Sequence, residues 1–141
     1  MRRGGFALLA TLVAITIIGA LVSGALFATL ARERAAAAEL RSVRALAFAE
    51  YGLAVTVSAG GWDSSWSAAP PGLAGTRALV DGDAVDTVRI ALLGERLCLV
   101  ASEARVGAGR EAARRRVAAL VVLDPAGAPS LAPVRAWTDV P

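Results

Sequence analysis

The chain has 141 residues, with 15 basic residues, all of them arginine, against 12 acidic ones, a single cysteine and no histidine. Its formal charge of +3 falls to +1 without Arg2 and Arg3, a balance that argues against a nucleic-acid-binding surface. With no histidine, no metal-spaced cluster and no phosphate-binding glycine loop, the sequence offers no catalytic residue, metal ligand or cofactor site, and we predict that the protein is not an enzyme.

A long apolar run, Phe6 to Leu30, follows a short basic leader at residues 1–5. At about 1.5 Å per residue the run reaches roughly 37 Å as a helix, more than the roughly 30 Å hydrocarbon core of a bilayer. A secretory signal would end at a cleavage site, but this run passes into the helix-forming stretch Ala31 to Leu40. We predict one retained helix that spans a membrane once. Arg2 and Arg3 favour a cytoplasmic N-terminus, with the rest of the chain outside the cytoplasm.

The helix is predicted to continue as an amphipathic extension over residues 31–58 and to end at Gly60-Gly61. Apolar residues recur along it at three- and four-residue intervals and form a narrow stripe. The stripe is predicted to cover the rest of the domain, with packing against a partner as the alternative. The membrane span contains two glycines. Either they allow close approach of a second helix, or they have no special role, since membrane helices commonly tolerate glycine. The two glycines are Gly19 and Gly24. The residues of the stripe are Ala36, Leu40, Val43, Ala47, Tyr51 and Ala54.

Residues 59–141 are predicted to form a small β-rich head. A loop from Trp62 to Gly72 carries two tryptophans that we expect to cover the helix end. Short apolar runs separated by glycine turns then predict an antiparallel meander, which gives an α+β fold with the helix packed on the sheet. The predicted strands are residues 78–80, 85–93, 96–106 and 110–123, with a last edge strand at 134–137; residues 111–116 could instead be helical.

Three smaller features of the head have simple structural interpretations. Cys98 lies in an apolar run and is predicted to be a small buried residue, with an intermolecular disulfide as the alternative. The triplet Arg114 to Arg116 is predicted to be a solvated strand end or a charged guard of a sheet edge, with a phosphate site as the alternative. Asp81, Asp83 and Asp86 flank a glycine turn and are predicted to be solvated; they lack the other oxygen ligands of a calcium loop.

Gly5-Phe6 with the apolar run behind it resembles the class III signal of type IV pilin-like proteins. The resemblance implies cleavage after Gly5 by a prepilin peptidase, N-methylation of Phe6, a helical stem and a globular head. Most major pilins carry glutamate at the fifth mature position, where this chain has Ala10. In lacking this glutamate the chain resembles minor pilins of the PilX type and the tip pseudopilins of type II secretion, which often lack it too. The segment Ala49-Glu50-Tyr51-Gly52-Leu53 resembles an Ala-Glu-x-Gly-Leu motif of such minor pilins.

The resemblance implies a structural minor pilin or pseudopilin that primes or caps a type IV pilus-like filament near its tip. Its implied partners are other pilins, met through the N-terminal helix, the prepilin peptidase and the inner-membrane assembly platform. The implied location is the inner membrane, followed by an extracellular or periplasmic filament. The alternative function is a bitopic anchor subunit of an envelope complex that does not polymerise.

Overall fold

The computed structural model of the chain describes residues 3–58, 62, 71–94, 96–125, 128–132 and 137–140, without the side chains of 3–6 and 137–140. The chain divides into two compact units, residues 1–37 and 38–141. The first unit contains the N-terminal part of helix α1, and the second contains the end of α1 together with the sheet.

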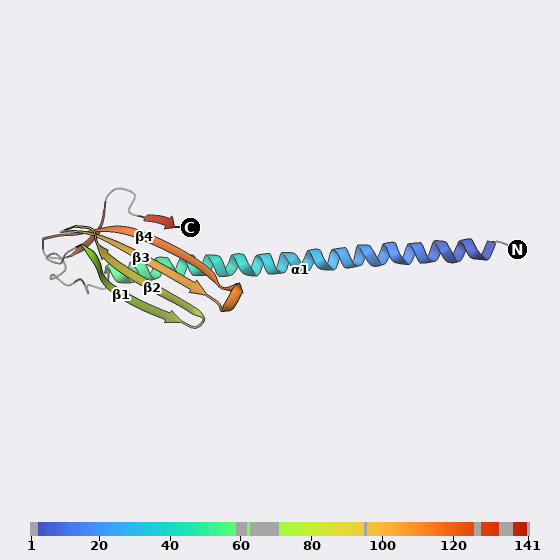
Figure 1. Cartoon of the computed structure of the whole chain (residues 1–141), viewed down its shortest axis with the longest axis horizontal. Coiled ribbons are helices and arrows are strands. Elements are labelled where there is room, and N and C mark those ends of the chain that lie inside the picture. Colours follow the sequence, from blue (N-terminus) through green and yellow to red (C-terminus); the bar gives the residue numbers. More distant parts are fainter. Residues whose placement is uncertain are drawn as a thin grey trace. The chain divides into compact units, whose positions relative to one another are not determined.

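Helix α1 runs from Arg3 to Ser58 (Figure 1). Its described side chains from residue 7 to residue 30 are all exposed, although nearly all are apolar. The three threonines of this stretch are satisfied within the helix: the hydroxyls of Thr11, Thr16 and Thr29 donate to carbonyls of the preceding turn at 2.8–2.9 Å. A helix that is apolar all round and internally hydrogen-bonded is compatible with membrane anchoring.

The second unit contains an antiparallel meander of four long strands, drawn in sequence order in Figure 1: β1 (Gly72–Asp81), β2 (Ala84–Leu92), β3 (Leu97–Val106) and β4 (Ala113–Leu123). Two short strands, β5 (Pro129–Leu131) and β6 (Trp137–Val140), both pair with β4. Gly82 has φ of +59° in the two-residue turn between β1 and β2, a conformation that glycine adopts without strain. The predicted α+β arrangement of one helix on an antiparallel sheet is confirmed.

The strand boundaries differ from the predicted ones by one residue at β2 and β3, and by more at β1, at the start of β4 and near the C-terminus. Strand β1 starts at Gly72, within the predicted loop, because pairing with β2 recruits residues of weak strand propensity. Strand β5 was not predicted, since three residues are too few for a periodic signal. Of the predicted strand 134–137, residues 134–136 lie outside the described ones; Trp137 is the first residue of β6, which continues to Val140. Residues 113–116 are strand, as predicted, but the predicted start at residue 110 is wrong, because a 3₁₀ turn, η2 (Gly109–Glu111), precedes β4.

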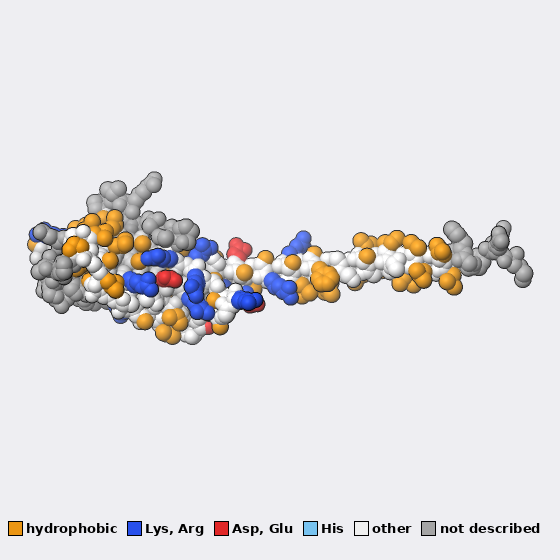
Figure 2. All heavy atoms as spheres, viewed as in Figure 1, with side chains coloured by type: hydrophobic (Ala, Val, Ile, Leu, Met, Phe, Trp, Pro, Cys, Tyr) orange, Lys and Arg blue, Asp and Glu red, His pale blue; other side chains and the backbone are white. Residues whose placement is uncertain are grey.

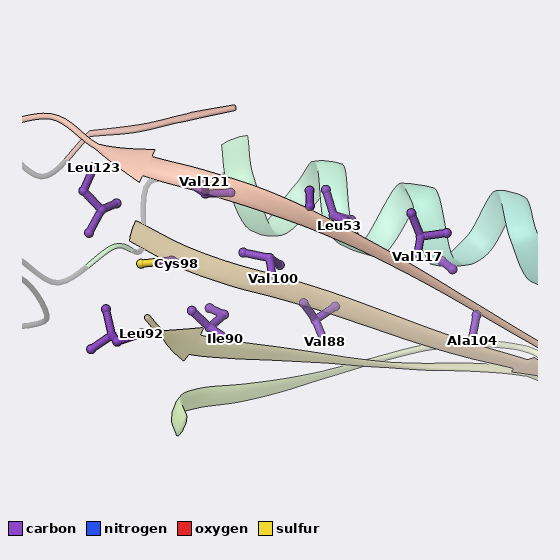
Figure 3. Close-up of a cluster of buried hydrophobic side chains, with 12 residues drawn as sticks. Leu53, Val88, Ile90, Leu92, Cys98, Val100, Ala104, Val117, Val121 and Leu123 are labelled. Atoms are coloured by element: carbon purple, nitrogen blue, oxygen red, sulfur yellow. The ribbon is translucent and has the colours of Figure 1, made fainter. Parts of the chain in front are cut away.

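The core lies between the sheet and the end of α1 (Figure 3). Alternate residues of the central strands point toward the helix, as the period of two in a strand requires. Figure 3 shows Leu53 from α1 among Val88, Val100 and Val121 from three successive strands, and all four side chains are fully buried. Cys98 is also fully buried in this cluster, as predicted, and burial raises the pKa of its thiol.

The face of α1 that covers the sheet is not the predicted one. Leu40, Val43 and Tyr51 are 71%, 58% and 55% exposed, and Ala47 and Ala54 are exposed as well. In an alanine-rich helix several stripes satisfy the apolar period, so periodicity alone does not select one. The sheet packs against the stripe with the smaller side chains, which lets backbone approach backbone. The buried helix residues are Ala45, Ala49, Gly52, Leu53 and Thr56.

Candidate functional site

The motif-like segment Ala49 to Leu53 lies where α1 crosses the centre of the sheet. Ala49 and Leu53 are completely buried, whereas Glu50 is exposed. Tyr51 is also largely exposed and stacks on Phe48 of the same helix, with ring centroids 6.2 Å apart. Ala49, Gly52 and Leu53 therefore face the sheet, where the space between helix and strands limits the size of each side chain.

A buried carboxylate lies directly under this segment. Asp86 is on the inner face of β2 and is fully buried, with the Ser102 hydroxyl 2.8 and 2.9 Å from its two oxygens. A Cβ placed at Gly52 would overlap Asp86 Oδ2 and would lie 3.2 Å from Ser102 Oγ. Glycine at position 52 therefore makes room for the carboxylate between helix and sheet.

Burial dominates the electrostatics of Asp86. Desolvation raises the pKa of this carboxyl, the hydrogen bonds from Ser102 and from the Thr87 backbone oppose the rise, and nearby Glu103 adds to it. Among the described residues no arginine forms an ion pair with Asp86. The predicted solvation of the three acids is thus wrong for Asp86, although Asp81 and Asp83 are exposed. The sequence did contain a signal for this burial. Asp86 is two residues from both Ala84 and Val88, so in a strand it lies on the same face as these inward-facing residues.

Three polar contacts join the beginning of the helical segment in the second unit to the strands and turns. Arg41 lies 3.0 Å from the Glu111 carboxylate and donates to its backbone carbonyl at 2.9 Å. Arg44 pairs with Asp83 at 3.0 Å. Arg115 projects from the inner face of β4 and donates to the Ser42 hydroxyl at 2.9 Å. Exposed ion pairs of this kind contribute up to about 1 kcal/mol each.

The other end of this segment is closed by Trp62. Its indole N–H donates to the Thr56 carbonyl at 3.1 Å, which satisfies an acceptor in the last turn of α1. The prediction that the loop tryptophans cover the helix end is confirmed for Trp62, while Trp66 lies outside the described residues. Arg114 and Arg116 are exposed on the outer face of the sheet, as predicted for a solvated triplet.

The remaining predicted site residues lie in the N-terminal part of α1. Gly5 and Phe6 are helical, but their side-chain surroundings lie outside what the structure describes. Ala10 is exposed, and a Cβ built at Gly19 or Gly24 would meet nothing within 4 Å. The open surface at both glycines leaves close approach by another helix as a prediction.

The described part of the chain contains no cluster of histidine, cysteine or acidic residues suited to a metal ion. Comparison with known proteins returned no match: no family model, no curated protein and no solved structure is similar to this chain. The feature of the described residues that bears most directly on function is the exposed apolar part of α1.

Proposed function

We propose that this chain is a structural minor pilin, or minor pseudopilin, that primes or caps a type IV pilus-like filament near its tip. One observation carries the proposal: the apolar side chains from residue 7 to residue 30 are uncovered, in a helix that continues into a small α+β head. Such a surface requires a covering of lipid or of other apolar helices. Both coverings are expected for a subunit that passes from the membrane into a filament.

Ala10 supports a position near the tip. After cleavage at Gly5, the charged amino group of Phe6 would enter an apolar environment, where an unpaired charge is costly by several kcal/mol. A carboxylate at the fifth mature position of a neighbour could neutralise that amino group. Ala10 has no charge to offer, so this subunit gains nothing from a shaft position that requires one.

The deciding experiment is intact-mass spectrometry of the protein purified from its native membrane. The proposal predicts a mature chain that begins at Phe6 and carries an added N-terminal methyl group. A Gly5→Leu variant serves as the control, because it should block cleavage and keep Met1 and the leader. A wild-type chain that still begins at Met1 would support the second candidate, a bitopic anchor subunit that never polymerises; the exposed apolar helix is equally suited to that role.

The tip position has its own test. Ala10→Glu would supply the missing carboxylate, and we expect the variant to be incorporated along the whole filament. Immunogold labelling of the head in sheared filaments measures the distribution, with Ala14→Glu as a control that adds the same charge elsewhere in the stem. An unchanged distribution for Ala10→Glu would count against a tip position determined by charge.

A further inference from the structure

The outer face of the sheet, away from α1, carries a concentration of arginines. Figure 2 shows basic side chains gathered around an acidic one on the visible surface of the head. On this face, Arg105 of β3 is directly opposite Arg114 of β4, and Glu103 is directly opposite Arg116. Arg89 of β2 shares the same face. Like charges directly opposite each other on neighbouring strands destabilise a sheet, so the Arg105–Arg114 pair is unfavourable by itself.

A groove with a volume of about 350 Å³ lies over these strands. It is within the size range of small-ligand sites. The groove residues include Arg89, Arg105 and Arg114, with Glu103, Asp83 and Thr87. Asp83 is already paired with Arg44, so its charge is partly compensated elsewhere. The positive charge of the three arginines therefore exceeds the negative charge of Glu103, and the groove is basic.

Arg105 supplies a second, independent observation. Its Nε is buried and has no hydrogen-bond partner among the described residues. A buried donor without an acceptor is normally destabilising. Because this Nε is buried, a ligand in the groove would bind the other guanidinium nitrogens of Arg105, which are not among the buried unpartnered atoms of the described residues and which suit carboxylate and phosphate oxygens. The ion pairs formed within the described residues are Arg41–Glu111 and Arg44–Asp83, neither of which involves Arg105 or Arg114.

We propose that this groove, here called the arginine groove (Arg89, Glu103, Arg105 and Arg114), binds an acidic polypeptide segment of a partner protein, with one carboxylate between Arg105 and Arg114. The balance of charge favours a polypeptide over a nucleic acid. Glu103 would repel a continuous row of phosphates but can accept a backbone N–H of a peptide. The described groove residues also lack aromatic rings on which bases could stack.

The test uses the full-length chain in detergent micelles at low ionic strength. A fluorescein-labelled peptide of alternating glutamate and glycine is titrated by fluorescence anisotropy, alongside a matched glutamine–glycine peptide. We expect binding of the glutamate peptide alone. Arg105→Gln and Arg114→Gln should each weaken it about tenfold, as expected for loss of one charge-assisted hydrogen bond. Arg110→Gln is the matched control, because it removes the same charge from η2, outside the groove.

A thermal melt of the same variants separates binding from a structural role. Removing one arginine of an unfavourable pair should leave the melting temperature unchanged or raise it while peptide binding is weakened. Absent binding of the glutamate peptide, or equal weakening by Arg110→Gln, would overturn the proposal. So would preferential binding of inorganic phosphate or of a single-stranded oligothymidylate, since either result would assign the groove to a phosphate ligand.

Discussion

At the residue scale, the contact between Gly52 and Asp86 determines how closely the helix approaches the sheet. The carboxylate occupies the volume that a side chain at position 52 would need. Ser102 supplies a side-chain hydrogen bond to this buried group, in addition to the one from the Thr87 backbone. Position 52 is therefore constrained by a polar contact, in contrast to the neighbouring apolar packing at Ala49 and Leu53.

Substituting Gly52→Ala is expected to destabilise the head by about 1–3 kcal/mol, the usual effect of overpacking a tight interface. Urea unfolding of the full-length chain, followed by tryptophan fluorescence, measures the change. The double variant Gly52→Ala/Asp86→Ala is the informative control, because removing the carboxylate vacates the space that the new methyl group needs. Additive losses in the double variant would show that the two residues do not compete for the same volume.

The raised pKa of Asp86 predicts a pH dependence of stability. The folded state keeps the carboxyl protonated above its usual pKa of 3.8, so folding binds a proton between that value and the raised one. The free energy of unfolding contributed by Asp86 is therefore highest at acidic pH and falls as the pH rises through this window. Asp86→Asn should remove the dependence, so its stability relative to wild type should increase with pH and then level off.

Ser102→Ala provides a second variant for the same measurement. It removes a hydrogen bond that favours the ionised carboxylate, so the pH window over which stability is lost should widen. Denaturation curves recorded from pH 4 to pH 8 in wild type and both variants give the comparison. Identical pH profiles for wild type and Asp86→Asn would contradict the assignment of this dependence to Asp86.

At the element scale, the second half of α1 has two apolar faces with different roles. One face, centred on Ala45, Ala49 and Leu53, is buried on the sheet, and the other, with Leu40 and Tyr51, is exposed. The sheet itself is ordinary in construction, since its inner residues alternate with outer ones along each strand. The helix therefore contributes its less bulky face to the core and leaves larger apolar side chains uncovered.

A pair of truncations distinguishes the two faces. Leu53→Ala removes a fully buried side chain and should lower the free energy of unfolding by about 2–5 kcal/mol. Leu40→Ala makes the same chemical change at a position that is 71% exposed, and its effect should stay within about 0.5 kcal/mol. Equal losses in equilibrium unfolding would mean that the exposed face is covered in the purified protein.

At the scale of the whole molecule, uncovered apolar surface occurs in both units. In residues 7–30 all described side chains are exposed, and in the second unit the Leu40–Val43–Tyr51 stripe is exposed as well. Contiguous apolar surface of this kind indicates contact with lipid or with protein partners. In the proposed filament, the first would meet neighbouring stems and the second would meet neighbouring subunits.

The exposed stripe predicts a separation between stability and assembly. Val43→Arg places a charge on the exposed face and should leave the unfolding of the head within about 0.5 kcal/mol of wild type. Recovery of the subunit in sheared filaments should fall, because burying an unpaired charge between subunits is unfavourable. Arg32→Ala serves as a control that alters a charge elsewhere on the helix. Normal recovery of Val43→Arg would show that this stripe stays outside the subunit contacts.

Much of the fold was predictable because its signals are local. The apolar run, the helix-forming continuation and the glycine turns each act within a few residues, so the long helix and the four-stranded meander follow from the sequence alone. The inward position of Cys98 follows in the same way from its apolar neighbours. The short strands β5 and β6 are different, because three or four residues carry too little periodic signal to fix their bounds, which depend on pairing with β4.

Only the tertiary structure decided which helix face is buried and which acid enters the core. Leu40, Val43 and Tyr51 satisfy the helical period as well as Ala45, Ala49 and Leu53 do, and the choice between them depends on how closely a sheet can approach. Judged from neighbouring residues alone, Asp86 resembles Asp81 and Asp83. It is nevertheless buried, because Gly52 leaves space for its carboxylate and Ser102 donates a hydrogen bond to it, and both residues are remote in sequence. Local patterns determine elements; complementarity between distant residues determines how those elements fit together.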